Sequence, residues 1–151
     1  MAFDVNTGVR IQLIAGVEAA AIVDPFYEGE GKGHHRARNS DLFFAAFIEN
    51  TIVGVCRFCI EENNPMLRSM VIHAPLRSKK IGASILKRFA TYLDTNNFRS
   101  TYCIPYGHLE KFYGLIGFKI INEEDGPAFL QKRIQEYRKN SSNAYMIMRR
   151  D

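Results

Sequence analysis

Residues 70–82 have the sequence MVIHAPLRSKKIG, and this stretch decides the fold. It predicts the end of a strand, then a basic loop, then the first turn of a helix. The N-terminus of a helix has unpaired backbone N–H groups and a partial positive charge, so it attracts anions. Arg77, Lys79 and Lys80 add cations at this point, and Gly82 lets the backbone approach a ligand closely. The residues support a phosphate-binding loop, or equally a connection whose basic side chains are only solvated.

Strands and helices alternate on both sides of this stretch. Apolar residues at helical spacing predict a helix that begins near Ile81 and ends at Asn96-Asn97. Going outward along the chain, we expect a strand at 9–14, a helix at 16–23 that stops before Pro25, strands at 42–48, 52–60, 67–73 and 98–104, a helix at 108–116, a strand at 118–122, a helix at 128–139 and a strand at 144–148. This order predicts an α/β protein, with a mixed sheet and helices on its faces.

Length and composition limit the class of protein. A chain of 151 residues with 46% hydrophobic residues predicts one folded domain over residues 1–151. The longest apolar run, 42–48, is too short to cross a bilayer, so we expect no membrane partner. No secretory signal is visible, so we expect a cytoplasmic protein with free cysteines. The net charge of +4 weakly favours an anionic partner, such as nucleic acid or a polyphosphate cofactor.

Cys56 and Cys59 form a C-x-x-C pattern within an expected strand. Residues three apart on a strand point to opposite faces, so these two thiols cannot hold one metal ion together. Cys103 stands alone in the sequence. We therefore expect the cysteines to pack in the core, and we expect no metal site.

Two polar segments admit a structural or a functional interpretation. Residues 28–39, EGEGKGHHRARN, predict a loop or a short polar helix. His34 and His35 in that segment are metal ligands, substrate contacts or, by preference, solvated side chains. Residues 132–139 form a basic helical segment, which we interpret as a solvated face in preference to a nucleic-acid surface.

Two motifs together resemble the GNAT superfamily, the acyl-CoA-dependent N-acetyltransferases. Residues 77–83, RSKKIGA, resemble the family signature Arg/Gln-x-x-Gly-x-Gly/Ala, and residues 112–118, FYGLIGF, resemble its F-Y-x-x-x-G-F ending. The expected order of elements is similar to the family over nearly the whole chain. The family usually has glycine where this chain has Lys80. If that position needs a positive φ, lysine fits poorly; if its conformation is ordinary, Lys80 adds a cation near the phosphates.

The resemblance implies a fold and a cofactor site. The fold is a mixed, mostly antiparallel sheet that splays between its fourth and fifth strands and has helices on both faces. The cosubstrate is acetyl-CoA, whose pantetheine arm would lie beside the backbone of Met70, Val71 and Ile72. Tyr106 lies where many relatives place an asparagine that contacts the cofactor. The pyrophosphate would bind the backbone amides of Arg77, Ser78, Lys79, Lys80, Ile81, Gly82 and Ala83.

Direct transfer of an acetyl group to an amine requires two proton movements. An amine with a pKa of about 10.4 must lose a proton to attack, so a base or a water chain is needed. The departing CoA thiolate benefits from a proton donor, and Tyr113 matches the family tyrosine with that role. The strands expected at 67–73 and 98–104 contain no acid, so the base is not identified. The candidates that stay open are His73, His108 and a water chain to backbone carbonyls.

The resemblance predicts an N-acetyltransferase acting on a small-molecule or peptide amine, and it allows a homodimer. In the family, the segment between the first two strands forms one wall of the acceptor groove. Glu28 and Glu30 in that segment favour a cationic acceptor. Arg36 and Arg38 oppose one. The first alternative is a non-catalytic acyl-CoA sensor or interaction module on the same fold, and the second is a small basic nucleic-acid-binding domain, which we favour less.

Overall fold

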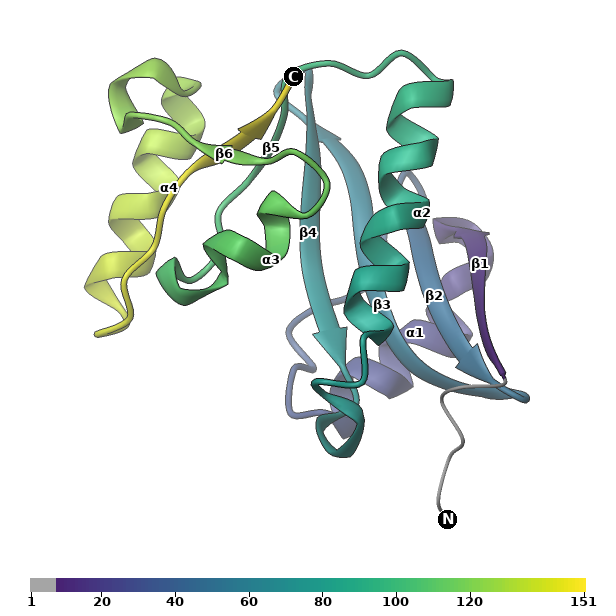
Figure 1. Cartoon of the computed structure of the whole chain (residues 1–151). Coiled ribbons are helices and arrows are strands. Elements are labelled where there is room, and N and C mark those ends of the chain that lie inside the picture. The colour runs from purple at the N-terminus through teal and green to yellow at the C-terminus, as the bar shows by residue number, and fades with distance from the viewer. Residues whose placement is uncertain (1–7) are drawn as a thin grey trace.

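The computed structural model describes residues 8–151 as a seven-stranded sheet with helices on both faces (Figure 1). The strand order is β1-β2-β3-β4-β5-β7-β6, and every neighbouring pair is antiparallel except β4 and β5. The strands are β1 (Val9–Ala15), β2 (Leu42–Ile48), β3 (Thr51–Glu61), β4 (Asn64–Ile72), β5 (Thr101–Cys103), β6 (Lys119–Ile120) and β7 (Met148–Arg150). The α-helices are α1 (Gly16–Gly29), α2 (Ile81–Thr95), α3 (Glu110–Gly114) and α4 (Ala128–Lys139), with 3-10 turns at Ala74–Leu76, Gly107–Leu109 and Glu123–Asp125. The predicted mixed α/β sheet is confirmed.

Three apolar clusters hold the helices to the sheet. Helix α2 lies against one face of β2, β3 and β4, and α1 lies behind the opposite face (Figure 1). The α2 side is centred on Phe44, Phe58 and Phe89, and the α1 side on Tyr27 and Phe43. Helix α4 closes a third cluster over the β5–β7 half of the sheet. Strands β2 and β3 are buried on both faces, as their continuous apolar runs predict.

Strand β4 contains a bulge at Ser69, and it diverges from β5. Val55 pairs with Val71, and Arg57 pairs with Arg68, so two residues of β4 lie opposite the single residue Cys56. Ser69 adopts a φ of 55° there. Beside β5, the only paired position of β4 in the described chain joins Met66 to Tyr102. The strands therefore separate beyond that point, which is the splay that the resemblance implies.

Several predicted boundaries are wrong. Helix α1 continues through Pro25 to Gly29, although we expected it to end before the proline. Pro25 is exposed, and the turn beyond it buries Phe26 and Tyr27 against the sheet, so packing outweighs the lost backbone hydrogen bond. The last strand is β7 at 148–150 rather than 144–148, because Tyr145 makes only an isolated bridge to Tyr106. Strands β5 and β6 are also shorter than the expected 98–104 and 118–122.

The C-x-x-C pattern is divided between the two faces of the sheet, as predicted. Cys56 packs in the cluster under α2, whereas Cys59 packs in the cluster under α4. Both thiols and Cys103 are buried and free, so the three cysteines are core residues. Among the described helices, none combines the length and the apolar character needed to cross a bilayer.

The loop that joins α1 to β2 is fastened to the first turn of α1. The Gly16 backbone N–H donates to the Asp41 carbonyl at 2.7 Å. A Cβ on Gly16 would overlap the Arg38 carbonyl oxygen and would lie 2.9 Å from the Asp41 carbonyl oxygen. Only glycine therefore permits this close approach of loop and helix.

We expect Gly16→Ala to lower the free energy of unfolding by about 1–3 kcal/mol, because the added methyl group must push backbone atoms apart. Urea denaturation followed by circular dichroism measures the change. Gly29→Ala is the matched control at the other end of α1, since a Cβ there meets nothing within 4 Å. Equal unfolding midpoints for the two variants would contradict this account.

Candidate functional site

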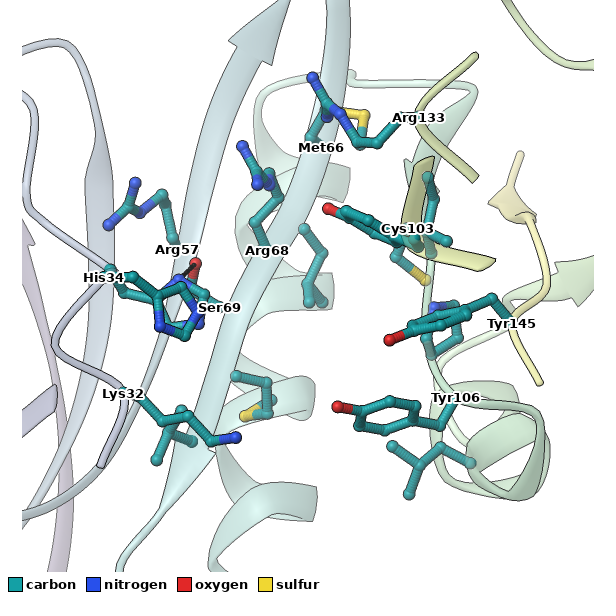
Figure 2. Close-up of a pocket in the computed structure, with 18 of the residues that line it drawn as sticks. Lys32, His34, Arg57, Met66, Arg68, Ser69, Cys103, Tyr106, Arg133 and Tyr145 are labelled. Atoms are coloured by element: carbon teal, nitrogen blue, oxygen red, sulfur yellow. Dashed lines mark hydrogen bonds between the residues drawn. The ribbon is translucent and has the colours of Figure 1, made fainter. Parts of the chain in front are cut away.

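The divergence of β4 from β5 opens a cavity of about 590 Å³ (Figure 2). This volume suits a small-molecule site. Its walls come from the loop after α1, from β3 and β4, from the segment after β5, and from α3, α4 and the segment before β7. The lining residues are Lys32, His34, His35, Arg36, Arg38, Arg57, Met66, Leu67, Arg68, Ser69, Met70, Val71, Cys103, Ile104, Pro105, Tyr106, Leu109, Tyr113, Arg133, Tyr137 and Tyr145.

Four of the predicted site residues meet at this cavity. Met70 and Val71 line it from β4, Tyr106 from the segment after β5, and Tyr113 from α3. Ile72 is the last residue of β4 and is not a lining residue. The predicted phosphate loop, residues 77–83, also lies outside the lining, between the end of β4 and the first turn of α2. The predicted pantetheine site on β4 and the predicted pyrophosphate site at residues 77–83 therefore follow one another along the chain.

The N-terminus of α2 has free backbone donors. No side chain caps it, and the N–H groups of Ile81, Gly82 and Ala83 donate to no carbonyl in the part of the chain that the structure describes. Such donors attract an anion. Arg77, Ser78, Lys79 and Lys80 precede them and are exposed. The features that a pyrophosphate needs are therefore present.

Lys80 adopts the left-handed conformation, with φ 65° and ψ 13°. The alternative left open by the sequence is decided: the loop keeps the backbone shape that favours glycine, although the residue is lysine. Ser78, two residues earlier, also has a positive φ, of 68°. An L-residue in this region costs about 1–2 kcal/mol, so Lys80 introduces strain.

The two sequence motifs touch through Gly82. A Cβ on Gly82 would lie 2.8 Å from Cζ of Phe112, which is too close for any real contact. The glycine therefore allows the FYGLIGF segment to pack on the first turn of α2. This packing requirement accounts for Gly82 without a ligand, beside the close approach to phosphate that we expected.

Tyr113 is buried at the cavity wall. Its ring packs edge-on against Phe112 and Phe118, with centroid distances of 5.0 and 6.2 Å. Burial raises the pKa of the phenol well above its ordinary value, and the nearby Cys103 and Cys56 thiols add to the effect. Tyr113 is therefore a neutral phenol at physiological pH, which is the form that can donate a proton.

The histidines considered as bases lie elsewhere. His73 Nδ1 is 2.7 Å from Glu30 Oε2, outside the lining of the cavity. His108 is stacked on Tyr106 at 5.8 Å and does not line the cavity either. Tyr106 does line it, and burial together with the Tyr145 hydroxyl raises its pKa. Neither histidine is placed to accept a proton inside the cavity.

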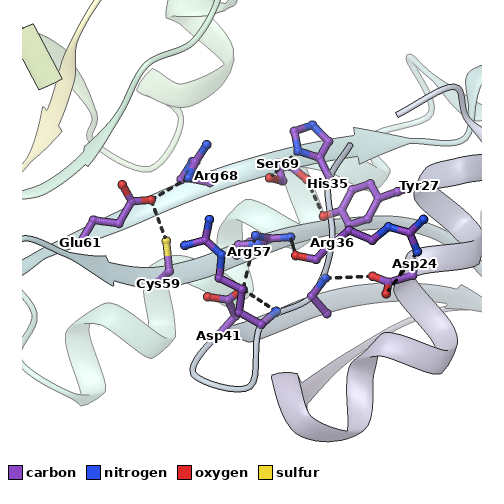
Figure 3. Close-up of polar contacts among 12 residues, drawn as sticks. Asp24, Tyr27, His35, Arg36, Asp41, Arg57, Cys59, Glu61, Arg68 and Ser69 are labelled. Atoms are coloured by element: carbon purple, nitrogen blue, oxygen red, sulfur yellow. Dashed lines mark hydrogen bonds and ion pairs between the residues drawn. The ribbon is translucent and has the colours of Figure 1, made fainter. Parts of the chain in front are cut away.

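His35 is a cavity residue that the sequence interpretation treated as solvated. It is half-buried, and its Nδ1 lies 3.1 Å from Ser69 Oγ (Figure 3). Burial, together with the neighbouring charges of His34, Arg57 and Arg68, lowers its pKa to about 4. His35 is therefore a neutral imidazole that contacts the bulge of β4.

The sequence interpretation also missed three arginines. Arg57, Arg68 and Arg133 line the cavity from β3, β4 and α4. Arg57 is 5% exposed, and a charged residue inside the apolar run 52–60 was the signal available for it. Arg133 belongs to the basic segment of α4 that we interpreted as solvated, so that interpretation is wrong for this residue. No signal in the sequence distinguishes Arg133 from its exposed neighbour Lys132.

Comparisons with known proteins agree with this geometry. Residues 24–135 match the family described as "Acetyltransferase (GNAT) domain". Escherichia coli ElaA is similar in structure, with 15% identity, a TM-score of 0.66, and coverage of 95% of this chain and 99% of that one. The PaiA N-acetyltransferase from Thermoplasma acidophilum, solved with coenzyme A, has 15% identity, a TM-score of 0.64, and coverage of 96% and 99%. No curated protein sequence matches significantly. The family match covers most of the chain, and the chain therefore belongs to the GNAT acetyltransferase family.

Proposed function

We propose that this protein transfers an acetyl group from acetyl-CoA to a primary amine. The observation that supports it best is the cavity beside diverging β4, which gathers Met70, Val71, Tyr106 and Tyr113. The uncapped N-terminus of α2 follows the end of the same strand. A stretch of strand without a partner on one side, a cavity and an anion-binding helix end suit a ligand with an extended amide arm and a pyrophosphate.

The residues present fit coenzyme A. The backbone of Met70, Val71 and Ile72 would pair with the pantetheine amides, because β4 is not paired with β5 there. The backbone amides of residues 77–83 would hold the pyrophosphate, with Arg77, Lys79 and Lys80 as exposed cations around it. When bound, acetyl-CoA supplies a thioester that an amine can attack.

Tyr113 is the proton donor in this proposal. Its phenol is buried, neutral and at the cavity wall, so it can protonate a thiolate as that charge develops. The base is a different matter. His35 has a pKa of about 4, which is poorly matched to an ammonium proton, so we propose that a chain of water molecules carries the proton of the amine out to solvent.

The alternative is a sensor that binds acyl-CoA without turnover. Two observations favour it: none of the lining residues is a carboxylate, and Lys80 strains the phosphate loop. A sensor releases no CoA thiol when amines are added, whereas an enzyme does.

Calorimetric titration with acetyl-CoA, beside dephosphorylated pantetheine, tests cofactor binding. We expect micromolar affinity for acetyl-CoA and much weaker binding of the control, because the pyrophosphate is lost. An amine panel read by release of CoA thiol then separates enzyme from sensor. No binding at high micromolar acetyl-CoA would remove the acetyltransferase proposal.

We expect Tyr113→Phe to lower kcat about 100-fold or more, with the Kd for acetyl-CoA unchanged, because only proton donation is removed. Single-turnover kinetics and calorimetry measure the two quantities. Tyr92→Phe on α2 is the matched control, since that tyrosine packs on Phe44 and Phe58 away from the cavity. A loss of affinity without a loss of kcat would instead make Tyr113 a binding residue.

We expect Lys80→Gly to raise the free energy of unfolding by about 1 kcal/mol, because glycine accepts the left-handed conformation without strain. Lys79→Gly is the control: it removes the same charge at an exposed residue whose φ is not positive. Urea denaturation compares their stabilities, and acetyl-CoA titration compares their affinities. Lys80→Gly should bind at least as tightly as Lys79→Gly. An unfolding midpoint of Lys80→Gly below that of Lys79→Gly would contradict the claim that the left-handed conformation of Lys80 is strained.

A further inference from the structure

One end of the cavity is strongly cationic. Arg68 on β4 lies directly opposite Arg57 on β3, and Arg133 reaches the same region from α4. Figure 2 shows Arg68 and Arg133 beside Met66, with Tyr106 toward the other end of the cavity. Like charges directly opposite one another on a sheet destabilise it. The arrangement therefore calls for compensating anions.

Carboxylates behind the cavity compensate this charge only in part. Asp41 Oδ2 lies 3.3 Å from Arg57 Nη1. Glu61 serves two arginines at once, with its Oε1 2.7 Å from Arg68 Nη1 and its Oε2 2.6 Å from Arg133 Nη2. Figure 3 shows the Arg68–Glu61 and Arg57–Asp41 contacts. The group of Glu61, Arg68 and Arg133 thus keeps one positive charge that no carboxylate in it balances.

Two buried guanidinium donors near this charge have no partner. Arg57 Nε and Arg133 Nη1 are both buried and make no hydrogen bond to any residue within 8–151. The Arg57 side chain is only 6% exposed. A buried donor without an acceptor is unfavourable by about 1–3 kcal/mol, and more when it belongs to a charged group. The guanidinium groups of Arg57 and Arg133 are therefore not fully satisfied by hydrogen bonds within the protein.

This end of the cavity lies away from the predicted phosphate loop. Arg68 precedes the bulge at Ser69, whereas the loop begins after Ile72 at the end of β4. The strand between them spans on the order of 10 Å. An anion bound by Arg68 and Arg133 would therefore lie apart from a pyrophosphate bound at the start of α2.

We propose that the acceptor is an amine that bears a carboxylate, and that Arg68 and Arg133 bind this carboxylate. The inference rests on the acetyltransferase function proposed above. A carboxylate carries one charge, which matches the one charge that Glu61 leaves unbalanced on Arg68 and Arg133, and its two oxygens suit guanidinium donors. None of the residues that line the cavity is acidic, and six are cationic: Lys32, Arg36, Arg38, Arg57, Arg68 and Arg133.

The acidic residues that could favour a cationic acceptor are placed elsewhere. Glu30 lies 2.7 Å from His73 and also accepts the Ala74 backbone N–H at 3.0 Å. Glu28 is exposed. Neither lines the cavity, whereas Arg36 and Arg38 from the same segment do. In the segment 28–39, the fold therefore places the two arginines at the cavity and the two glutamates away from it.

The first test compares acceptors that differ in one group. The panel holds free amino acids, the carboxamide of each, aminoethyl phosphate and spermidine, and kcat/KM is read by release of CoA thiol from acetyl-CoA. We expect at least one amino acid to react about tenfold or more faster than its carboxamide. Faster turnover of carboxamides or spermidine than of the amino acids would overturn the proposal that the acceptor bears a carboxylate. It would leave the proposed acetyltransferase function intact. Faster turnover of aminoethyl phosphate than of any amino acid would overturn the carboxylate proposal too.

The second test removes the binding group. With the best amino acid, Arg133→Gln should raise KM at least about tenfold and leave the Kd for acetyl-CoA unchanged. Arg133→Lys should restore part of the affinity for the amino acid, because lysine keeps the positive charge but lacks the paired donors of a guanidinium group. Lys132→Gln is the matched control, since it removes one charge from the exposed neighbour on α4.

The outcomes separate the two proposals. An unchanged KM in folded Arg133→Gln, checked by urea denaturation, would overturn the assignment of Arg133. A weaker Kd for acetyl-CoA in that variant would assign the arginine to the cofactor instead. Binding of acetyl-CoA without turnover of any amine would refute both proposals and favour the sensor. Failure to bind acetyl-CoA would remove the function itself.

Discussion

The bulge of β4 at Ser69 is the constraint on which the rest of the structure depends. An extra residue in β4 turns the strand away from β5, and Ser69 takes a positive φ to allow it. Two side chains hold that conformation: the Tyr27 hydroxyl donates to the Ser69 carbonyl at 2.8 Å, and His35 Nδ1 contacts Ser69 Oγ at 3.1 Å. Tyr27 is fully buried, so its hydrogen bond fixes the bulge to the core. The cavity beside the bulge is therefore part of the folded structure itself.

Strand β4 also separates two groups of hydrogen-bond donors. Beyond its C-terminal end, the start of α2 offers backbone donors, which bind an anion without regard to its detailed shape. Before the bulge, Arg68 and its neighbours offer guanidinium groups, which discriminate by geometry. Burial makes the second group selective, because a charged donor removed from water must find a partner. A cofactor common to a family and an acceptor particular to one member can therefore be bound by different parts of one strand.

Much of this architecture could be predicted, and the failures have identifiable causes. The strands at 42–48 and 52–60 are correct because continuous apolar runs indicate burial on both faces. The end of α1 was wrong because proline is a local signal, whereas the burial of Tyr27 beyond it is a property of the whole fold. Met70, Val71, Tyr106 and Tyr113, which the resemblance named as site residues, all line the cavity, whereas Ile72 and residues 77–83 do not. Arg133 was missed because helical spacing alone cannot say which face of a basic helix meets a cavity.

The sequence by itself determined the order of elements, the placement of the two motifs, and the cysteines as core residues, since these follow from periodicity and local chemistry. The tertiary structure alone decided the conformation of Lys80, the sharing of Glu61 between Arg68 and Arg133, and the inward position of His35. The physical reason is that backbone strain and the partners of a charge depend on residues far apart in the chain. Glu61 and Arg133 are brought together only when α4 packs on the sheet.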